Sequence, residues 1–364
     1  MRITAAVLRE KTAAHTLETV ELADPGPQEV IVRISGVGLC HTDMLPRAPA
    51  YPAPLPLIAG HEGSGVVTGV GADVTGIAVG DHVIASFDSC GACANCLAAH
   101  PAYCATFAAR NMSGRALDGS TVARDASGAE VSARWFGQSS FASHALVAAN
   151  NLVVVDADLP LELLGPLGCG VQTGAASVFT ALRVRPGESI VVFGVGAVGL
   201  SAVMAARVAG ATTIVAVDRL ESRLELATEL GATHALAADA DLVGEIHRIT
   251  DGGAQYTVDT TGVPEVILAG VNALRVTGTC GLLGVPQGEM AFDPRILSFG
   301  KTIMGIIEGD AVPRRTIPAL IELWRQGRFP FDRLVSTFPL ERINEAEQAM
   351  ARGDVVKPVL VPAA

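Results

Sequence analysis

The chain has 364 residues, which is long for a single hydrophobic core, so we expect two domains. Its composition, 49% hydrophobic and 17% charged, is that of a well-packed globular protein. The formal net charge of −11 argues against nucleic acid and anionic membrane surfaces as partners, because both select basic faces.

We expect no signal peptide at the N-terminus, because Arg9, Glu10 and Lys11 interrupt the apolar run that such a peptide needs. The segment 189–217 could be mistaken for a membrane span, since Arg207 is its only charge. Its glycines and its change from a strand-like to a helix-like pattern favour a buried α/β core instead. We therefore expect a cytoplasmic protein.

The first ~150 residues contain short β-type segments separated by Gly and Pro, for example 30–35, 65–70 and 82–86. This pattern predicts an antiparallel, partly barrel-like domain. From Pro186 onward strands alternate with helices, which predicts a parallel, doubly wound sheet. The expected strands are 189–193, 213–217, 234–237, 256–259 and 280–284. The first expected helix follows the glycine-rich turn and ends near residue 208, and the others span 221–230, 241–249 and 264–274.

Beyond Lys301 the sequence predicts one more strand, an amphipathic helix at 317–326 and a terminal strand at 355–360. We expect the terminal strand to rejoin the first domain. The nucleotide-binding domain would then be an insertion in the first domain.

A G-x-G-x-x-G string, formed by Gly194, Gly196 and Gly199, follows an expected strand and opens a helix. In this context the first glycine makes a tight turn, the second lets a pyrophosphate approach the backbone, and the third permits close helix–strand packing. The free N–H groups of the helix N-terminus favour the phosphates. Asp218 ends the next strand and can accept the ribose hydroxyls, which favours NAD over NADP, although Arg219 beside it could reach a phosphate.

Cys90, Cys93, Cys96 and Cys104 have the spacing C-x2-C-x2-C-x7-C, which suits a closed tetrahedral zinc site. A redox disulfide is the rival interpretation, but four cysteines exceed what it needs. Such a zinc stabilises a lobe and performs no chemistry, because no ligand position is open. A nucleic-acid role is disfavoured, since no Lys or Arg lies between these cysteines.

Three dispersed residues, Cys40, His61 and Cys169, lie beside glycines or polar loop residues from which a ligand can protrude. Each alone is more often a core residue than a ligand. Together they supply the three protein ligands that leave a fourth zinc position open for chemistry.

The strings Cys40–Asp43 and Gly60–Val66, the cysteine lobe and the glycine-rich loop occur here in one order. Together they resemble the zinc-containing medium-chain alcohol dehydrogenase family over essentially the whole chain. The resemblance implies an α/β fold with a β-rich GroES-like catalytic domain and a doubly wound Rossmann domain that binds NAD(H). The expected boundaries are 1–165 and 302–364 for the catalytic domain, and 166–301 for the Rossmann domain.

The resemblance also implies the ligands of two zinc ions, one catalytic and one structural. Cys40, His61 and Cys169 match the catalytic ligands, and Glu62 matches a carboxylate that can approach the metal. Asp43 matches an acid that holds the His61 ring, as zinc-bound imidazoles commonly require. Cys90, Cys93, Cys96 and Cys104 match the structural ligands.

Thr42 matches the hydroxyl that accepts the alcohol proton. In several relatives a histidine five residues after the first zinc cysteine completes the proton relay, but this chain has Leu45 there. The proton would therefore leave through the ribose hydroxyl and water, or through another side chain such as His41.

The resemblance places further residues around the cofactor and the substrate. His41 and Lys357 match pyrophosphate contacts, Arg223 matches a contact near the adenosine ribose, and Thr173 and Val198 match residues that position the nicotinamide. Cys280 matches no ligand position and is expected to be a buried strand residue. The expected substrate pocket comprises Tyr51, Trp135, Phe136 and Val285, the last also near the cofactor.

The strings 305–310 and 325–332 resemble the aryl-alcohol (benzyl alcohol) dehydrogenase branch, which is close to geraniol-type dehydrogenases. An aromatic wall suits benzyl or allylic alcohols, although Trp135 and Phe136 could equally anchor a loop. A thiol-dependent formaldehyde dehydrogenase is the rival enzyme. A non-catalytic NAD-binding protein is disfavoured by the intact ligand set. We expect a homo-oligomer, a dimer or a tetramer, with the segment 104–141 as a candidate interface.

Overall fold

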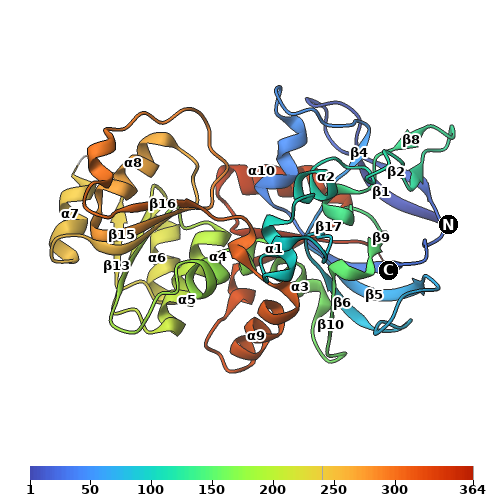
Figure 1. The fold of residues 1–364 in the computed structure, drawn as a ribbon. Helices are drawn as coiled ribbons and strands as arrows, with labels where there is room; N and C mark the ends of the chain where they lie inside the picture. Colours follow the sequence, from blue (N-terminus) through green and yellow to red (C-terminus); the bar gives the residue numbers. More distant parts are fainter. Residues whose placement is uncertain (240, 364) are drawn as a thin grey trace. The chain divides into compact units, whose positions relative to one another are not determined.

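The computed structural model describes residues 1–239 and 241–363 (Figure 1). These residues form two compact units. The first unit comprises Met1–Cys169, Val312–Pro318 and the segment from Asp332 onward, and the second comprises Gly170–Ala311 and Ala319–Phe331. Among the described residues, no helix is both long and apolar enough to cross a membrane.

The first unit is rich in β-strands, as the sequence predicts. One of its sheets has the strand order β4-β1-β2-β7-β8, and the other has the order β10-β6-β5-β3-β18-β17, with β9 also paired to β3. The strands are β1 (Arg2–Leu8), β2 (Thr16–Leu22), β3 (Glu29–Gly38), β4 (Leu57–Ile58), β5 (Gly63–Val70), β6 (His82–Ala85), β7 (Ala123–Arg124), β8 (Glu130–Val131), β9 (His144–Ala148), β10 (Leu152–Val155), β17 (Val335–Pro339) and β18 (Lys357–Val361). Its helices are α1 (Ala94–Leu97), α2 (Phe107–Asn111), α3 (Leu161–Leu164) and α10 (Ile343–Arg352).

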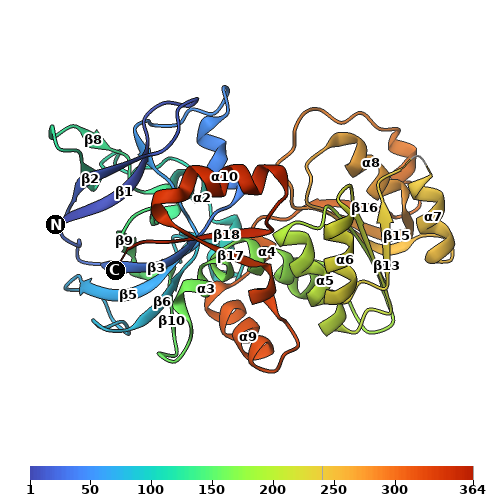
Figure 2. The same ribbon diagram turned by 180° about the vertical axis from the view of Figure 1, so that it is seen from behind.

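The terminal strand β18 joins this unit by pairing antiparallel with β3, Val359 opposite Gly38. It also pairs in parallel with β17, and α10 makes the connection between these two strands (Figure 2). A parallel pair needs such a crossover, which explains the helix between two short strands. The expectation that the C-terminal segment rejoins the first domain is therefore confirmed.

The second unit is built on a parallel sheet in the order β13-β12-β11-β14-β15-β16. Helices α5 and α6 pack together, as do α7 and α8 (Figure 1). Its strands are β11 (Ser189–Phe193), β12 (Thr213–Asp218), β13 (His234–Ala237), β14 (Ala254–Asp259), β15 (Leu274–Leu282) and β16 (Thr302–Gly305), and its helices are α4 (Gly170–Ala176), α5 (Ala197–Ala209), α6 (Glu221–Leu230), α7 (Leu242–Ile249) and α8 (Pro264–Asn272). Helix α9 (Pro313–Arg325) begins in the first unit and ends in the second.

The apolar segment 189–217 forms β11, α5 and most of β12, which confirms the α/β interpretation. The strand order reverses at β11, which lies between β12 and β14. In open parallel sheets, ligands bind beyond the carboxyl ends of the strands at such a reversal. The sheet also extends past the expected boundary at residue 301, because β16 pairs with β15, Thr302 opposite Thr279.

Candidate active site and cofactor site

The turn that carries His61 lies between β4 and β5. Gly60 has φ +89°, and a Cβ there would lie 2.5 Å from the backbone nitrogen of Phe141. Only glycine fits such a left-handed, closely packed position. The turn therefore fixes the backbone of His61 and Glu62, whose buried side chains lie directly before β5.

Asp43 holds the His61 ring, as predicted. His61 Nδ1 lies 2.7 Å from Asp43 Oδ1, and both side chains are fully buried. Burial lowers the pKa of His61, but the Asp43 carboxylate outweighs this effect and holds the pKa well above its usual value. A more basic imidazole is a stronger ligand, and an Nδ1–H that donates to Asp43 leaves Nε2 to bind a metal.

Cys40 and Cys169 complete the predicted ligand set. Cys40 immediately precedes a 3₁₀ helix, His41–Arg47, and Cys169 is the last residue before α4. His61 Nε2 lies 3.2 Å from Cys169 Sγ. Hydrogen bonding from Cys169 and the positive charge of Lys357 hold the pKa of the Cys40 thiol well below its usual value. The ligand atoms of Cys40, His61, Glu62 and Cys169 all lie within 4.8 Å of one another.

A buried ion pair lies beside these ligands. Lys357 Nζ is 2.9 Å from Glu62 Oε1 and donates to the carbonyl of Leu39 at 3.2 Å. Burial raises the pKa of Glu62, and the nearby ammonium opposes that shift. Lys357 is only 3% exposed, so its ammonium is committed to this pair. The pyrophosphate contact expected for Lys357 remains a prediction.

Thr42 and the residues after it form the predicted proton path. Thr42 is half-buried and His41 is exposed, both within the 3₁₀ helix that follows Cys40. Leu45 packs against the core of the first unit and offers no group that could carry a proton. Besides Asp43, which is bonded to His61, this helix places the hydroxyl of Thr42 and the exposed imidazole of His41 directly after Cys40.

Trp135 and Phe136, expected to line the substrate pocket, are buried against Asp43 and His61. Trp135 Nε1 donates to Asp43 Oδ1 at 3.1 Å, and the indole is 0% exposed. The Phe136 ring lies 4.4 Å from the His61 ring, centroid to centroid. Tyr51 meets Trp135 edge-on at 6.0 Å. Sequence reasoning missed the Trp135–Asp43 contact, because no local pattern links residues 92 positions apart.

The four-cysteine lobe has the geometry of a closed metal site. Its sulfurs lie close together, with Cys93 Sγ 3.5 Å and Cys90 Sγ 3.9 Å from Cys96 Sγ. Backbone N–H groups point at the sulfurs, for example that of Ala105 at 3.5 Å from Cys93 Sγ. This donor and its neighbours lower the pKa of Cys93 to about 6. Thiolates held by backbone donors are the ligand set that structural zinc prefers.

The glycine-rich loop fits a dinucleotide. Gly194 has φ +82°, and a Cβ on Gly199 would lie 2.0 Å from the Gly194 carbonyl oxygen. A Cβ on Gly196, which caps α5, would instead enter open space, its nearest atom being Arg223 Nη1 at 4.0 Å. The loop thus keeps room for a pyrophosphate where the N–H groups of α5 begin.

Most of the other expected cofactor residues lie in the same unit, whereas His41 and Lys357 lie in the first unit. Asp218 accepts hydrogen bonds from the backbone N–H groups of Val195 at 2.8 Å and of Arg219 at 2.7 Å. These bonds fix its carboxylate between the loop and the end of β12. Thr173 donates its hydroxyl to Glu308 at 3.3 Å. Val198 is half-buried in α5, and Val285 is 56% exposed. The expected positions of Val198 beside the nicotinamide and of Val285 beside cofactor and substrate remain predictions.

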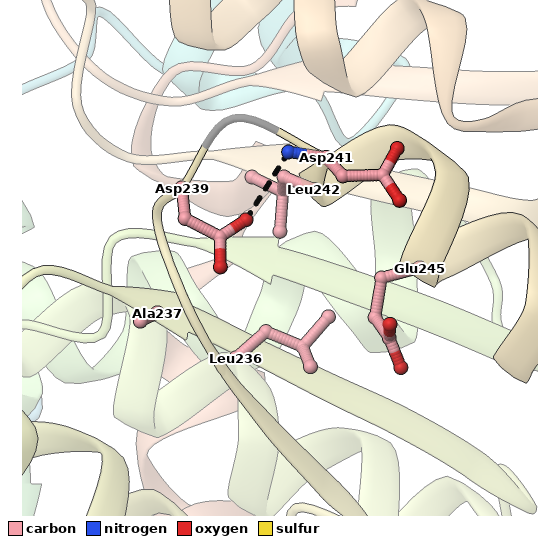
Figure 3. Close-up of a pocket in the computed structure, with 6 residues that line it drawn as sticks. All are labelled: Leu236, Ala237, Asp239, Asp241, Leu242 and Glu245. Carbon is pink, nitrogen blue, oxygen red and sulfur yellow. Dashed lines mark hydrogen bonds between the residues drawn. The ribbon is translucent and has the colours of Figure 1, made fainter.

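A cavity of about 190 Å³ lies at the carboxyl end of β13, whose Ala237 pairs with Asp218 (Figure 3). Figure 3 shows Leu236 on its floor between the carboxylates of Asp239 and Glu245. Negative charge at this sheet edge disfavours an additional phosphate group.

The fold and the ligand sets define a zinc- and nucleotide-dependent dehydrogenase. A model of the alcohol dehydrogenase GroES-like domain matches residues 26–157, and a model of zinc-binding dehydrogenases matches residues 197–326. The chain belongs to the zinc-containing medium-chain alcohol dehydrogenase family. It is an oxidoreductase with zinc and NAD(H) as cofactors, and both cysteine-containing clusters fit zinc by their donor chemistry.

Several relatives match over nearly their full length. A geraniol dehydrogenase from Castellaniella defragrans is 45% identical and covers 98% of this chain and 97% of its own. The crystal structure of a benzyl alcohol dehydrogenase from Acinetobacter calcoaceticus is 44% identical, with a TM-score of 0.96 over 100% of both chains. An alcohol dehydrogenase zinc-binding domain protein from Burkholderia ambifaria is 50% identical, with a TM-score of 0.97, again over 100% of both chains.

Proposed function

We propose that the chain reversibly oxidises primary aromatic or allylic alcohols to aldehydes, with transfer of a hydride to NAD. The observation that carries this proposal is the convergence of Cys40 with the buried His61 and Cys169, with His61 held by Asp43. Zinc bound by such a set supplies Lewis acidity, which favours deprotonation of an alcohol near neutral pH. The relatives named for geraniol and benzyl alcohol support the allylic or aromatic class.

Thr42 is our proposed first proton acceptor. Its hydroxyl lies on the 3₁₀ helix that begins directly after the ligand Cys40. Leu45 cannot continue the relay, because its side chain neither donates nor accepts a proton. The proton would then leave through water or through the exposed His41, and a bound cofactor would offer its ribose hydroxyl as a further route.

The cofactor residues support a preference for NAD over NADP. The Asp218 carboxylate lies at the end of β12, where it can accept ribose hydroxyls and repel a 2′-phosphate. The acidic cavity one strand away adds negative charge on the same sheet edge. Arg223, 8% exposed, lies behind Gly196, where we propose that it contacts the adenosine ribose.

We further propose that Tyr51, backed by the buried rings of Trp135 and Phe136, bounds the substrate pocket, and that the protein is a homo-oligomer. Aromatic walls favour a flat, apolar alcohol. Light scattering of the purified protein distinguishes monomer, dimer and tetramer.

The rate of NADH formation across a panel of alcohols tests the substrate class. Benzyl alcohol, cinnamyl alcohol and geraniol should give kcat/KM values at least about tenfold above those of ethanol and sorbitol, because the extra apolar surface is buried in the complex. A clear preference for ethanol or sorbitol contradicts the proposal. A requirement for an added low-molecular-weight thiol with formaldehyde would favour the rival enzyme class.

A further inference from the structure

We propose that Trp135 is a positioning residue for the zinc-binding histidine: its indole N–H holds Asp43, and Asp43 in turn holds His61. This inference rests on the proposed catalytic use of the Cys40, His61 and Cys169 set. It gives Trp135 a role distinct from that of a pocket wall. Three observations carry it: the bonding of Asp43, the confinement of the indole, and the path of the segment 135–141.

The Asp43 side chain is fully buried, so both of its carboxyl oxygens need hydrogen-bond donors. Its Oδ1 accepts from Gly60 N at 3.0 Å and Trp135 Nε1 at 3.1 Å, and it lies 2.7 Å from His61 Nδ1. Its Oδ2 accepts from Cys40 N at 3.1 Å. Backbone donors come from the segments that carry two zinc ligands, so the carboxylate ties these segments together. Trp135 Nε1 is the donor that arrives from a distant part of the sequence.

The indole of Trp135 is confined so that its N–H keeps this direction. The ring is fully buried between the edge-on ring of Tyr51 and the ring of Phe136, whose centroid is 5.5 Å away. The backbone N–H of Trp135 donates to Ser139 Oγ at 2.8 Å, which closes a tight turn. A buried indole that is fixed in this way donates to one acceptor only.

The segment 135–141 wraps around the His61 turn in a strained conformation. Phe136 and Ser139 have φ values of +50° and +51°, which are unfavourable for residues with a Cβ. Gln138 Nε2 donates to the His61 carbonyl at 2.9 Å, and Gln138 Oε1 accepts from Gly63 N at 3.1 Å. This backbone path brings Trp135 to Asp43 and Phe136 to the face of His61.

The substitution Trp135→Phe removes the N–H and keeps an aromatic ring. We expect the holoenzyme to lose its catalytic zinc to a chelator about tenfold faster or more, because partners of ligand histidines typically change metal affinity by this factor. The zinc of the four-cysteine lobe should be released at the native rate and serves as an internal reference. Cobalt substituted at the catalytic position should show a shifted visible spectrum, since the His61 geometry changes.

Trp324→Phe is the matched control, because it removes the other indole of the chain. It should leave zinc release and the cobalt spectrum unchanged. The double variant Asp43→Asn with Trp135→Phe tests whether Trp135 acts through Asp43. If it does, Trp135→Phe adds little to the zinc release of Asp43→Asn. Circular dichroism establishes that each variant is folded.

Zinc release is measured without turnover, so it separates this inference from the proposed function. Fast release from Trp135→Phe in an enzyme that oxidises none of the panel alcohols supports the inference and contradicts the function. Native zinc release and a native cobalt spectrum, together with an altered KM for alcohols, overturn the inference and make Trp135 a pocket wall. Equal effects of Trp135→Phe in the native and Asp43→Asn backgrounds also overturn it.

Discussion

At the level of individual residues, buried polar contacts surround the candidate zinc ligands. Cys40, His61 and Cys169 are recognisable because glycines and polar residues flank them, and the structure brings their ligand atoms together. Asp43 was assigned through its place in a motif, and its bond to His61 is confirmed. Three further contacts join residues that are distant in sequence. Trp135 donates to Asp43, Gln138 donates to the His61 carbonyl, and Lys357 pairs with Glu62. Such contacts depend on tertiary packing and leave no local pattern.

Glu347 on α10 provides a prediction of pH dependence. Its Oε1 lies 2.9 Å from His15 Nδ1, and its Oε2 lies 3.1 Å from Arg47 Nη2. Burial raises the pKa of Glu347, but these partners outweigh burial and hold the pKa below its usual value. A carboxylate whose pKa is lower in the folded state stabilises the protein above its unfolded pKa of about 4.3. That contribution is lost as the pH falls through the folded pKa.

Glu347→Gln should therefore lower the free energy of unfolding at pH 7 by about 1–2 kcal/mol, since it leaves Arg47 without its carboxylate. The deficit should shrink below about pH 4, where the native carboxylate becomes protonated. Urea unfolding at several pH values measures this difference in the free energy of unfolding. Glu345→Gln on the same helix is the control, because Glu345 pairs with Arg342 at the surface and should matter little. A deficit that is independent of pH contradicts this assignment.

At the scale of elements, the sequence predicted the second unit more closely than the first. The ranges 189–193, 221–230 and 234–237 coincide with β11, α6 and β13. Long apolar strands that alternate with helices give a strong periodic signal. Short strands such as β7 and β8, with two residues each, give none, because their pairing depends on distant partners. The segment 104–141 consequently had no predicted structure.

The glycine-rich turn before α5 gives a prediction about cofactor binding. Gly196→Ala places a methyl group in open space, so the free energy of unfolding should change by less than about 0.5 kcal/mol. The same methyl group occupies the space that we assign to the pyrophosphate, so the Kd for NADH should rise at least about tenfold. Gly199→Ala should instead destabilise the fold, because its Cβ meets the Gly194 carbonyl at 2.0 Å. Fluorescence titration and thermal unfolding measure both effects, and an unchanged Kd in Gly196→Ala refutes the placement.

The cysteine lobe gives a prediction about stability. Cys93→Ser removes one ligand of the closed site, so the chain should lose its structural zinc and about 2 kcal/mol or more of stability, because metal binding there contributes to folding. Cys280→Ser is the matched control: Cys280 is buried in β15 and belongs to neither ligand cluster. It should keep both zinc ions. Zinc content and the thermal midpoint are the measurements, and native values for Cys93→Ser would rule out a structural zinc.

In the molecule as a whole, the candidate zinc ligands and the candidate nucleotide site belong to different units. The candidate zinc ligands Cys40, His61 and Cys169 all belong to the first unit, and the glycine-rich loop with Asp218 belongs to the second. The length of the chain predicted two domains, and the order of the motifs predicted which domain holds zinc and which binds the nucleotide. The substrate could be predicted only as a class of alcohols, because the side chains that line an apolar pocket come from distant parts of the sequence and share no motif.

We propose that Cys40, His61 and Cys169 hold the zinc on which the alcohol dehydrogenase activity of this chain depends. The most direct test is the kcat for NADH formation from benzyl alcohol in Cys169→Ser, measured beside the zinc content. We predict a loss of at least about 10³-fold, with the fold and the zinc of the four-cysteine lobe retained, because a hard hydroxyl replaces a thiolate ligand. Near-native turnover of the variant, with both zinc ions bound, would contradict the claim.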